Sequence, residues 1–219
     1  MKALQTIKSL LCVAAAFGAM ALQNASASST YGFVNITNNS SVDVAGQLRM
    51  VVAAVGTTQA SFTFYNDIGI GSSITDIYFD DIAPGNPFGS YGPWSDSGAG
   101  VEFTVGADPA NLPGGNGIGF TATYSGDSDS PVAQLGVNKV DEWVSIIGTF
   151  SSTNNFNALL NALDNGTFRV GLKVQSIDGA GSNDSDGFVN VSAVPLPAAA
   201  WLFGSALFGF MMVSNRRKV

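Results

Sequence analysis

Short runs of alternating hydrophobic and polar residues fill the middle of the chain, and turn-forming residues separate them. In residues 167–174, four apolar side chains share one face, and Arg169 and Lys173 lie on the other. Successive side chains of a strand point to opposite faces, so this two-residue period, rich in β-branched and aromatic residues, predicts β-strands. Nine runs are expected to form strands: residues 31–36, 46–52, 61–65, 74–79, 101–105, 118–124, 142–147, 167–174 and 188–191.

One segment has helical spacing instead. Apolar residues from Phe156 to Leu163 recur at intervals of three and four, which predicts a helix with one buried face. Asn154 or Asn155 precedes them as an N-cap, and Gly166 follows as a stop. Many short strands with one short helix predict an all-β fold, an antiparallel β-sandwich that is jelly-roll-like.

The N-terminus has the three parts of a secretory signal peptide. Lys2 and Lys8 precede an apolar, uncharged run over residues 9–22, and Ala25 and Ala27 then satisfy the small-residue rule of signal peptidase. The apolar run is shorter than the roughly 20 residues that a membrane span needs. The sequence therefore predicts a signal peptide over residues 1–27, removed by cleavage after Ala27.

A second apolar segment lies near the C-terminus. Residues 198–213 carry no charge, and the basic residues Arg216, Arg217 and Lys218 follow. Basic residues that flank a membrane helix stay on the cytoplasmic side, which places the preceding domain outside the cytoplasm. The chain is thus divided into a signal peptide, an extracytoplasmic domain over residues 28–193 and a membrane-spanning tail over residues 194–219.

This tail resembles a known sorting signal. Pro195, Leu196 and Pro197, the apolar helix and the final Arg216-Arg217-Lys218 cluster resemble the PEP-CTERM signal, with Pro-Leu-Pro in place of the usual Pro-Glu-Pro. The resemblance implies recognition by an exosortase, which cleaves near the proline motif. It also implies a Gram-negative bacterium that makes exopolysaccharide, an inner-membrane anchor, and a final place in the cell envelope or outside the cell.

The domain between the two targeting segments also resembles the corresponding region of a group of PEP-CTERM proteins. The resemblance lies in residues 74–81, the loop at residues 111–115, residues 127–131 and the pair at residues 142–143. It implies no activity.

The charge distribution excludes several classes of function. The chain has 9 basic and 16 acidic residues, and the region between the terminal segments keeps only four of the basic residues and all of the acidic ones. Such an acidic domain repels phosphate backbones, so nucleic acid is not an expected partner. There is no histidine, and the only cysteine is Cys12 in the signal peptide, which excludes disulfides, Cys/His zinc sites and Ser-His-Asp chemistry from the mature domain.

A Gly-rich acidic stretch is the candidate metal site. Asp178, Asn183, Asp184 and Asp186 carry oxygen atoms of the kind that calcium binds. The alternative is a solvated acidic turn between two strands. Calcium is the only cofactor that the sequence indicates.

Two further candidate sites concern carbohydrate. Tyr91 and Trp94 lie in an aromatic loop whose rings can stack on sugars, or alternatively fix the loop to the core. The pairs Asp80-Asp81 and Asp141-Glu142 can act as glycosidase carboxylates if they lie about 5 to 9.5 Å apart, or alternatively they are solvated acids at strand ends.

These observations predict a non-enzymatic protein of the cell envelope or of an exopolysaccharide or biofilm matrix. Its processing partners are signal peptidase and an exosortase, and the C-terminal helix attaches it to the membrane. A lectin-like module that binds carbohydrate or calcium is the first alternative, and a glycan hydrolase is a distant second.

Overall fold

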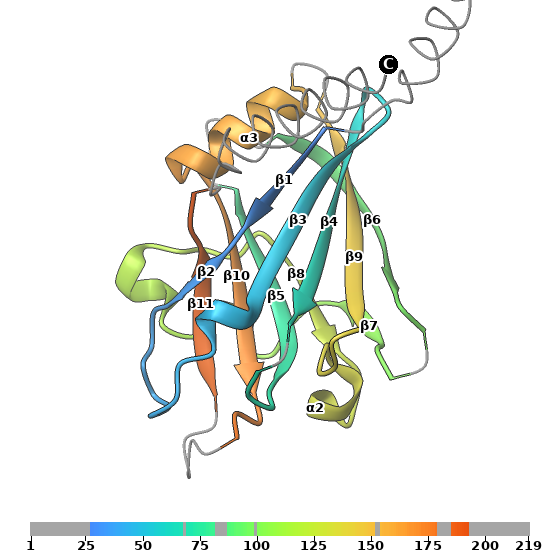
Figure 1. Cartoon of the computed structure of the whole chain (residues 1–219). Helices are drawn as coiled ribbons and strands as arrows, with labels where there is room; N and C mark the ends of the chain where they lie inside the picture. The colour runs from blue at the N-terminus through green and yellow to red at the C-terminus, as the bar shows by residue number, and fades with distance from the viewer. Residues whose placement is uncertain are drawn as a thin grey trace, which may run out of the picture.

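The structure is a computed structural model that describes residues 27–67, 69–81, 87–98, 100–151, 154–178 and 185–192. Two antiparallel sheets face each other, and helix α3 lies across one end of both (Figure 1). The all-β class predicted from the sequence is confirmed. Sheet A has five strands in the order β1 (Ser28–Tyr31), β3 (Leu48–Val55), β4 (Gln59–Asn66), β9 (Trp143–Phe150) and β6 (Phe88–Asp96).

Sheet B has six strands, and all of its neighbouring strands are antiparallel. Their order is β2 (Phe33–Asn35), β11 (Asp186–Asn190), β10 (Phe168–Gln175), β5 (Ser73–Asp81), β8 (Tyr124–Ser128) and β7 (Phe103–Val105). The expected strand at residues 31–36 is two strands, because the chain passes from sheet A to sheet B at Gly32.

The core lies between the sheets and is rich in aromatic rings. Phe62 and Phe64 of sheet A face Phe79 and Phe168 of sheet B, and all four are fully buried. Phe62 and Phe79 pack edge to face with their ring centroids 5.3 Å apart. The alternation seen in the sequence thus places one face of each sheet in a shared core, as expected for a sandwich.

Helix α3 (Phe156–Asn165) confirms the helix prediction. The Asn155 side chain accepts a hydrogen bond from the backbone of Ala158, and Gly166 ends the helix in a left-handed conformation, with φ of 75°. Leu159 and Leu163 are buried in the main core. The cap, the spacing and the stop were all local signals, so the sequence was sufficient to locate this helix.

Two further expectations differ from the structure. Residues 88–94, expected as a loop, belong to strand β6, whose glycines, Pro93 and two register irregularities conceal the two-residue period. The strand expected at residues 118–124 begins only at Tyr124, and the preceding Gly115–Ile118 forms a 3-10 helix, η2. Two other short helices are η1 (Ala45–Gln47) and α2 (Val132–Leu135).

Candidate functional site

The outer face of sheet B carries charges in pairs. Register places Asp80 of β5 opposite Arg169 of β10, and Asp76 of β5 opposite Lys173 of β10. The side chains of both aspartates are at most 1% exposed. Burying a carboxylate is costly unless it is paired and hydrogen-bonded, so each needs its cation.

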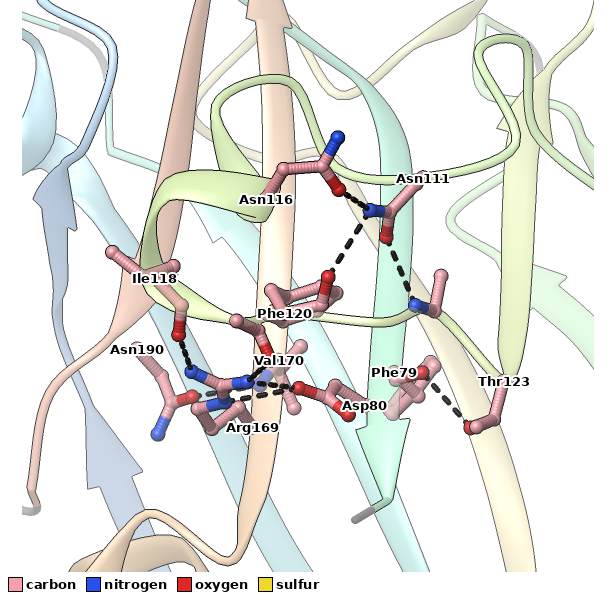
Figure 2. Close-up of polar contacts among 12 residues, drawn as sticks. Phe79, Asp80, Asn111, Asn116, Ile118, Phe120, Thr123, Arg169, Val170 and Asn190 are labelled. Atoms are coloured by element: carbon pink, nitrogen blue, oxygen red, sulfur yellow. Dashed lines mark hydrogen bonds and ion pairs between the residues drawn. The ribbon is translucent and has the colours of Figure 1, made fainter.

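Arg169 joins the sheet to the loop that covers it (Figure 2). Its Nε donates to Asp80 at 3.0 Å, and Nη2 also donates to Asp80. Nη1 donates to the carbonyl of Ile118 at 2.8 Å, and Nη2 donates to the carbonyl of Gly119 at 2.6 Å. The Asn111 side chain donates to the carbonyl of Phe120 at 3.1 Å and so fixes the same loop internally. The arrangement is a structural clamp between one ion pair and two loop carbonyls.

Glycines allow the covering loop, residues 106–122, to approach the sheet. A Cβ atom on Gly171 would lie 2.6 Å from the Leu112 side chain, and one on Gly187 would lie 2.3 Å from the carbonyl oxygen of Pro113. Real Cβ atoms essentially never come so close, so a side chain at either position would displace its neighbour, more easily at Gly171, which faces the flexible end of Leu112. A second, small core forms under the loop from Tyr78, Leu112, Phe120 and Val189.

A group of carboxylates surrounds Lys173 at the other end of the covered face. Its Nζ lies 3.1 Å from Asp76 Oδ2 and donates to the carbonyl of Asp108 at 3.0 Å. Burial, together with Asp76, raises the pKa of Asp127 to about 6, and Lys173 partly opposes this shift. Burial and the Asp76 carboxylate also raise the pKa of Tyr78, which donates to Pro109 at 3.0 Å. The ammonium group of Lys173 thus offsets the negative charge of both Asp76 and Asp127.

Tyr91 and Trp94 pack between the sheets. The Tyr91 ring stacks on Tyr124 with centroids 4.3 Å apart, and the Trp94 ring packs so closely over Gly126 that a Cβ there would lie 2.3 Å from it. The Tyr91 hydroxyl is buried and has no hydrogen-bond partner among the described residues, whereas the buried Trp94 Nε1 interacts with the Tyr124 hydroxyl. Burial raises the pKa of Tyr91, with a further contribution from Asp81. Both rings therefore pack against other side chains of the protein, as expected if they fix their segment to the core.

The acidic stretch is described only at its ends. Asp186 is fully buried in β11, where it accepts hydrogen bonds from Thr37 Oγ1 at 2.6 Å and from the backbone of Asn39 at 2.7 Å. Asp178 is exposed. Asn183 and Asp184 lie outside the described residues. Within the part of the chain that the structure describes, no group of three or more His, Cys, Asp or Glu side chains is arranged to hold a metal ion.

The carboxylates proposed for hydrolysis lie far apart. Val137 bridges Ile74 at the start of β5, and the next residue, Asn138, donates its backbone N–H to Glu142 at 2.9 Å. Asp80 is six residues further along β5, which at about 3.3 Å per residue places it roughly 20 Å from that end of the strand. Glycosidases need about 5 to 9.5 Å. The structure therefore does not bring Asp80 and Glu142 together.

The predicted targeting residues fall mainly outside the described residues. This holds for Ala25, for the sorting motif Pro195, Leu196 and Pro197, and for the basic cluster Arg216, Arg217 and Lys218. Ala27 is described, and its carbonyl accepts a hydrogen bond from the backbone of Ala54 at 2.9 Å. Among the helices of the described residues, none is long and apolar enough to cross a membrane.

The sequence interpretation missed a row of side chains on the outer face of sheet A. Register aligns Arg49 of β3, Tyr65 of β4 and Trp143 of β9 across three neighbouring strands. The buried neighbours Phe64 and Val144 point into the core, so Tyr65 and Trp143 point outward. The alternation in each strand predicted which side chains face out, but the pairing that aligns them is tertiary.

Comparisons of the chain with protein-family models, with curated proteins and with solved structures found no match.

Proposed function

We propose that this protein is an exported, non-enzymatic protein of the cell envelope or extracellular matrix of a Gram-negative bacterium, sorted by an exosortase. The boundaries of the β-sandwich carry the proposal. Strand β1 begins at Ser28, the residue after the expected cleavage position, and β11 ends at Asn190, shortly before the Pro195–Pro197 motif. The folded domain therefore fits the interval between the two targeting segments, and both can be cleaved without removing any strand of the described residues.

The first strand would stay in place after cleavage behind Ala27, at a small cost. Cleavage after Ala27 removes the hydrogen bond that its carbonyl accepts from Ala54, a loss of about 0.5–1.5 kcal/mol. The pairing of β1 with β3 from Ser28 to Tyr31 is kept. Tyr31, which is fully buried, continues to anchor the strand in the core.

We also propose that the two sheets form a jelly-roll-like sandwich. The chain alternates between the sheets, with β1, β3 and β4 in one and β2 and β5 in the other. Such crossings are what a jelly-roll-like sandwich requires, and they support that arrangement here.

The test is the intact mass of the protein recovered from the membrane and from the medium of its native host. We expect a form that starts at Ser28 and ends near residues 195–197, found outside the membrane fraction. A mass that retains Val219 and remains with the membrane would refute exosortase sorting.

A carbohydrate-binding module is the second candidate function. The observation that favours it is the outward row of Arg49, Tyr65 and Trp143, and not the Tyr91 and Trp94 pair. For the calcium alternative, titration calorimetry with and without chelator is decisive, since the absence of heat at millimolar calcium would end it.

A further inference from the structure

The two tryptophans that the structure describes have opposite surroundings. The Trp94 ring is partly buried against the core, and it lies 5.8 Å from Phe103 and 6.3 Å from Tyr124, centroid to centroid. Trp143 points to the outer face of sheet A, and among the described residues no aromatic ring packs on it. A flat apolar ring that is partly exposed on a sheet is a stacking surface for a ligand.

Trp143 belongs to an ordered row. Tyr65 is its direct partner on β4, and Arg49 is the direct partner of Tyr65 on β3. Directly opposite residues of antiparallel strands lie about 4.5–5.5 Å apart, so the three positions span about 10 Å. The row is thus large enough to contact more than one ring of an extended ligand.

The polar end of the row is held in place before any ligand arrives. The Arg49 guanidinium carbon lies 3.7 Å from the centroid of the Tyr65 ring, and Asp67 accepts from both Nε and Nη2 of Arg49. The side chains of Arg49 and Asp67 remain 35% and 43% exposed. Both side chains are therefore partly open to water, and such fixed planar groups suit pairs of neighbouring hydroxyls.

The face beside the row is almost uncharged and mixes hydroxyl and amide side chains with aliphatic ones. Arg49 is the only charged residue among the outward-facing positions of β3, β4 and β9. In the next row, Thr63 and Ser145 share a hydrogen bond of 3.0 Å at the centre of the sheet. An anionic partner would be repelled by the acidic domain.

From this arrangement we infer that Arg49, Tyr65 and Trp143, together with Asp67, form a binding site for a neutral polysaccharide. The apolar face of a sugar ring stacks on Trp143, and sugar hydroxyls exchange hydrogen bonds with Arg49 and Asp67. The partly exposed Thr63 in the next row extends the contact surface along the sheet. This inference deepens the second candidate function and rests on it.

The test measures binding by the full-length protein in a polyoxyethylene detergent, which contains no sugar. Native affinity electrophoresis and calorimetry would use mixed-linkage β-glucan, glucomannan and dextran as neutral probes and alginate as the anionic probe. We expect at least one neutral polysaccharide to bind, and we expect Trp143→Ala to raise its Kd at least tenfold. The matched controls are Ile147→Ala, on the same strand and face, and Trp94→Phe in the core, and both should bind as the wild type does.

Several results would overturn the inference. These are no binding to any neutral probe, binding to alginate alone, unchanged binding by a folded Trp143→Ala variant, and a dimer that this variant dissociates. If Trp143→Ala does not fold, Asp67→Asn decides: a loss of several-fold supports the site, and unchanged binding refutes it. The mass measurement is independent, so a failed sorting proposal and a failed binding site give different results.

Discussion

The outer faces of the two sheets follow the same alternation but have different surroundings. On sheet B, the loop at residues 106–122 covers the face, and Asp76, Tyr78 and Asp80 are at most 1% exposed although all are polar. On sheet A, Tyr65 and Trp143 are partly exposed and Ile147 is 37% exposed. Polar residues on a covered face become obligatory partners of one another, whereas those on an open face stay available to ligands.

Removing Arg169 should have the largest effect. Arg169→Ala leaves the Asp80 carboxylate buried without its cation and removes two hydrogen bonds to the covering loop. We expect the free energy of unfolding to fall by about 3–5 kcal/mol. Urea denaturation followed by circular dichroism measures it. A loss below 1 kcal/mol would mean that the clamp is not part of the stable fold.

Filling the glycine positions under the loop should have the next largest effect. In Gly187→Ala the new methyl group meets a backbone oxygen, that of Pro113, and we expect a loss of about 1–3 kcal/mol. Gly171→Ala meets the flexible end of Leu112 and should cost less. The control is Gly46→Ala, where nothing lies within 4 Å of the added atom. Equal denaturation midpoints for all three variants would refute the close approach of the loop.

The covered face should also show a pH dependence. The pKa of Asp127 rises from 3.8 to about 6 in the folded protein, first through burial and then through Asp76. Between these values the folded state binds more protons than the unfolded state, so this group lowers stability as pH rises from about 4 to about 6. The Asp127→Asn variant has no carboxyl group at this position, so this contribution to the pH dependence is absent from it.

The variant should therefore gain stability relative to the wild type as pH rises through this range, and the difference should then stay constant. The effect should be smaller than that of Arg169→Ala, because the group is only partly buried and Lys173 opposes the shift. Denaturation midpoints measured from pH 4 to pH 8 test it. A difference that is independent of pH would contradict the shift.

The smallest effect is expected on the open face. Arg49→Ala removes an ion pair whose side chains are 35% and 43% exposed, and we expect a loss of less than about 1 kcal/mol. The same denaturation measurement applies. If Arg49→Ala and Arg169→Ala cost the same, the distinction between the two faces would be wrong.

Local signals account for what the sequence predicted correctly. The strands at β3, β4, β5, β9 and β10 and the capped helix α3 each carry a period, a cap or a stop within a few residues. Strand β6 was missed because its glycines and Pro93 are read as turn residues, and only pairing with β9 holds it in the sheet. Asp80 and Glu142 were considered as a catalytic pair, but Glu142 lies near the start of β5 and Asp80 lies near its end.

The sequence by itself determined the all-β class, the helix, and the inward and outward positions of the long strands, because these depend on neighbouring residues. The charge balance and the absence of histidine also follow from it directly. Only the tertiary structure decided that Trp94 packs against the core and that Trp143 points to the outer face of sheet A. It also decided that Arg169 holds a loop over sheet B. Burial and partnership arise from contacts between residues distant in the chain, and alternation within one strand cannot specify which face another segment will cover.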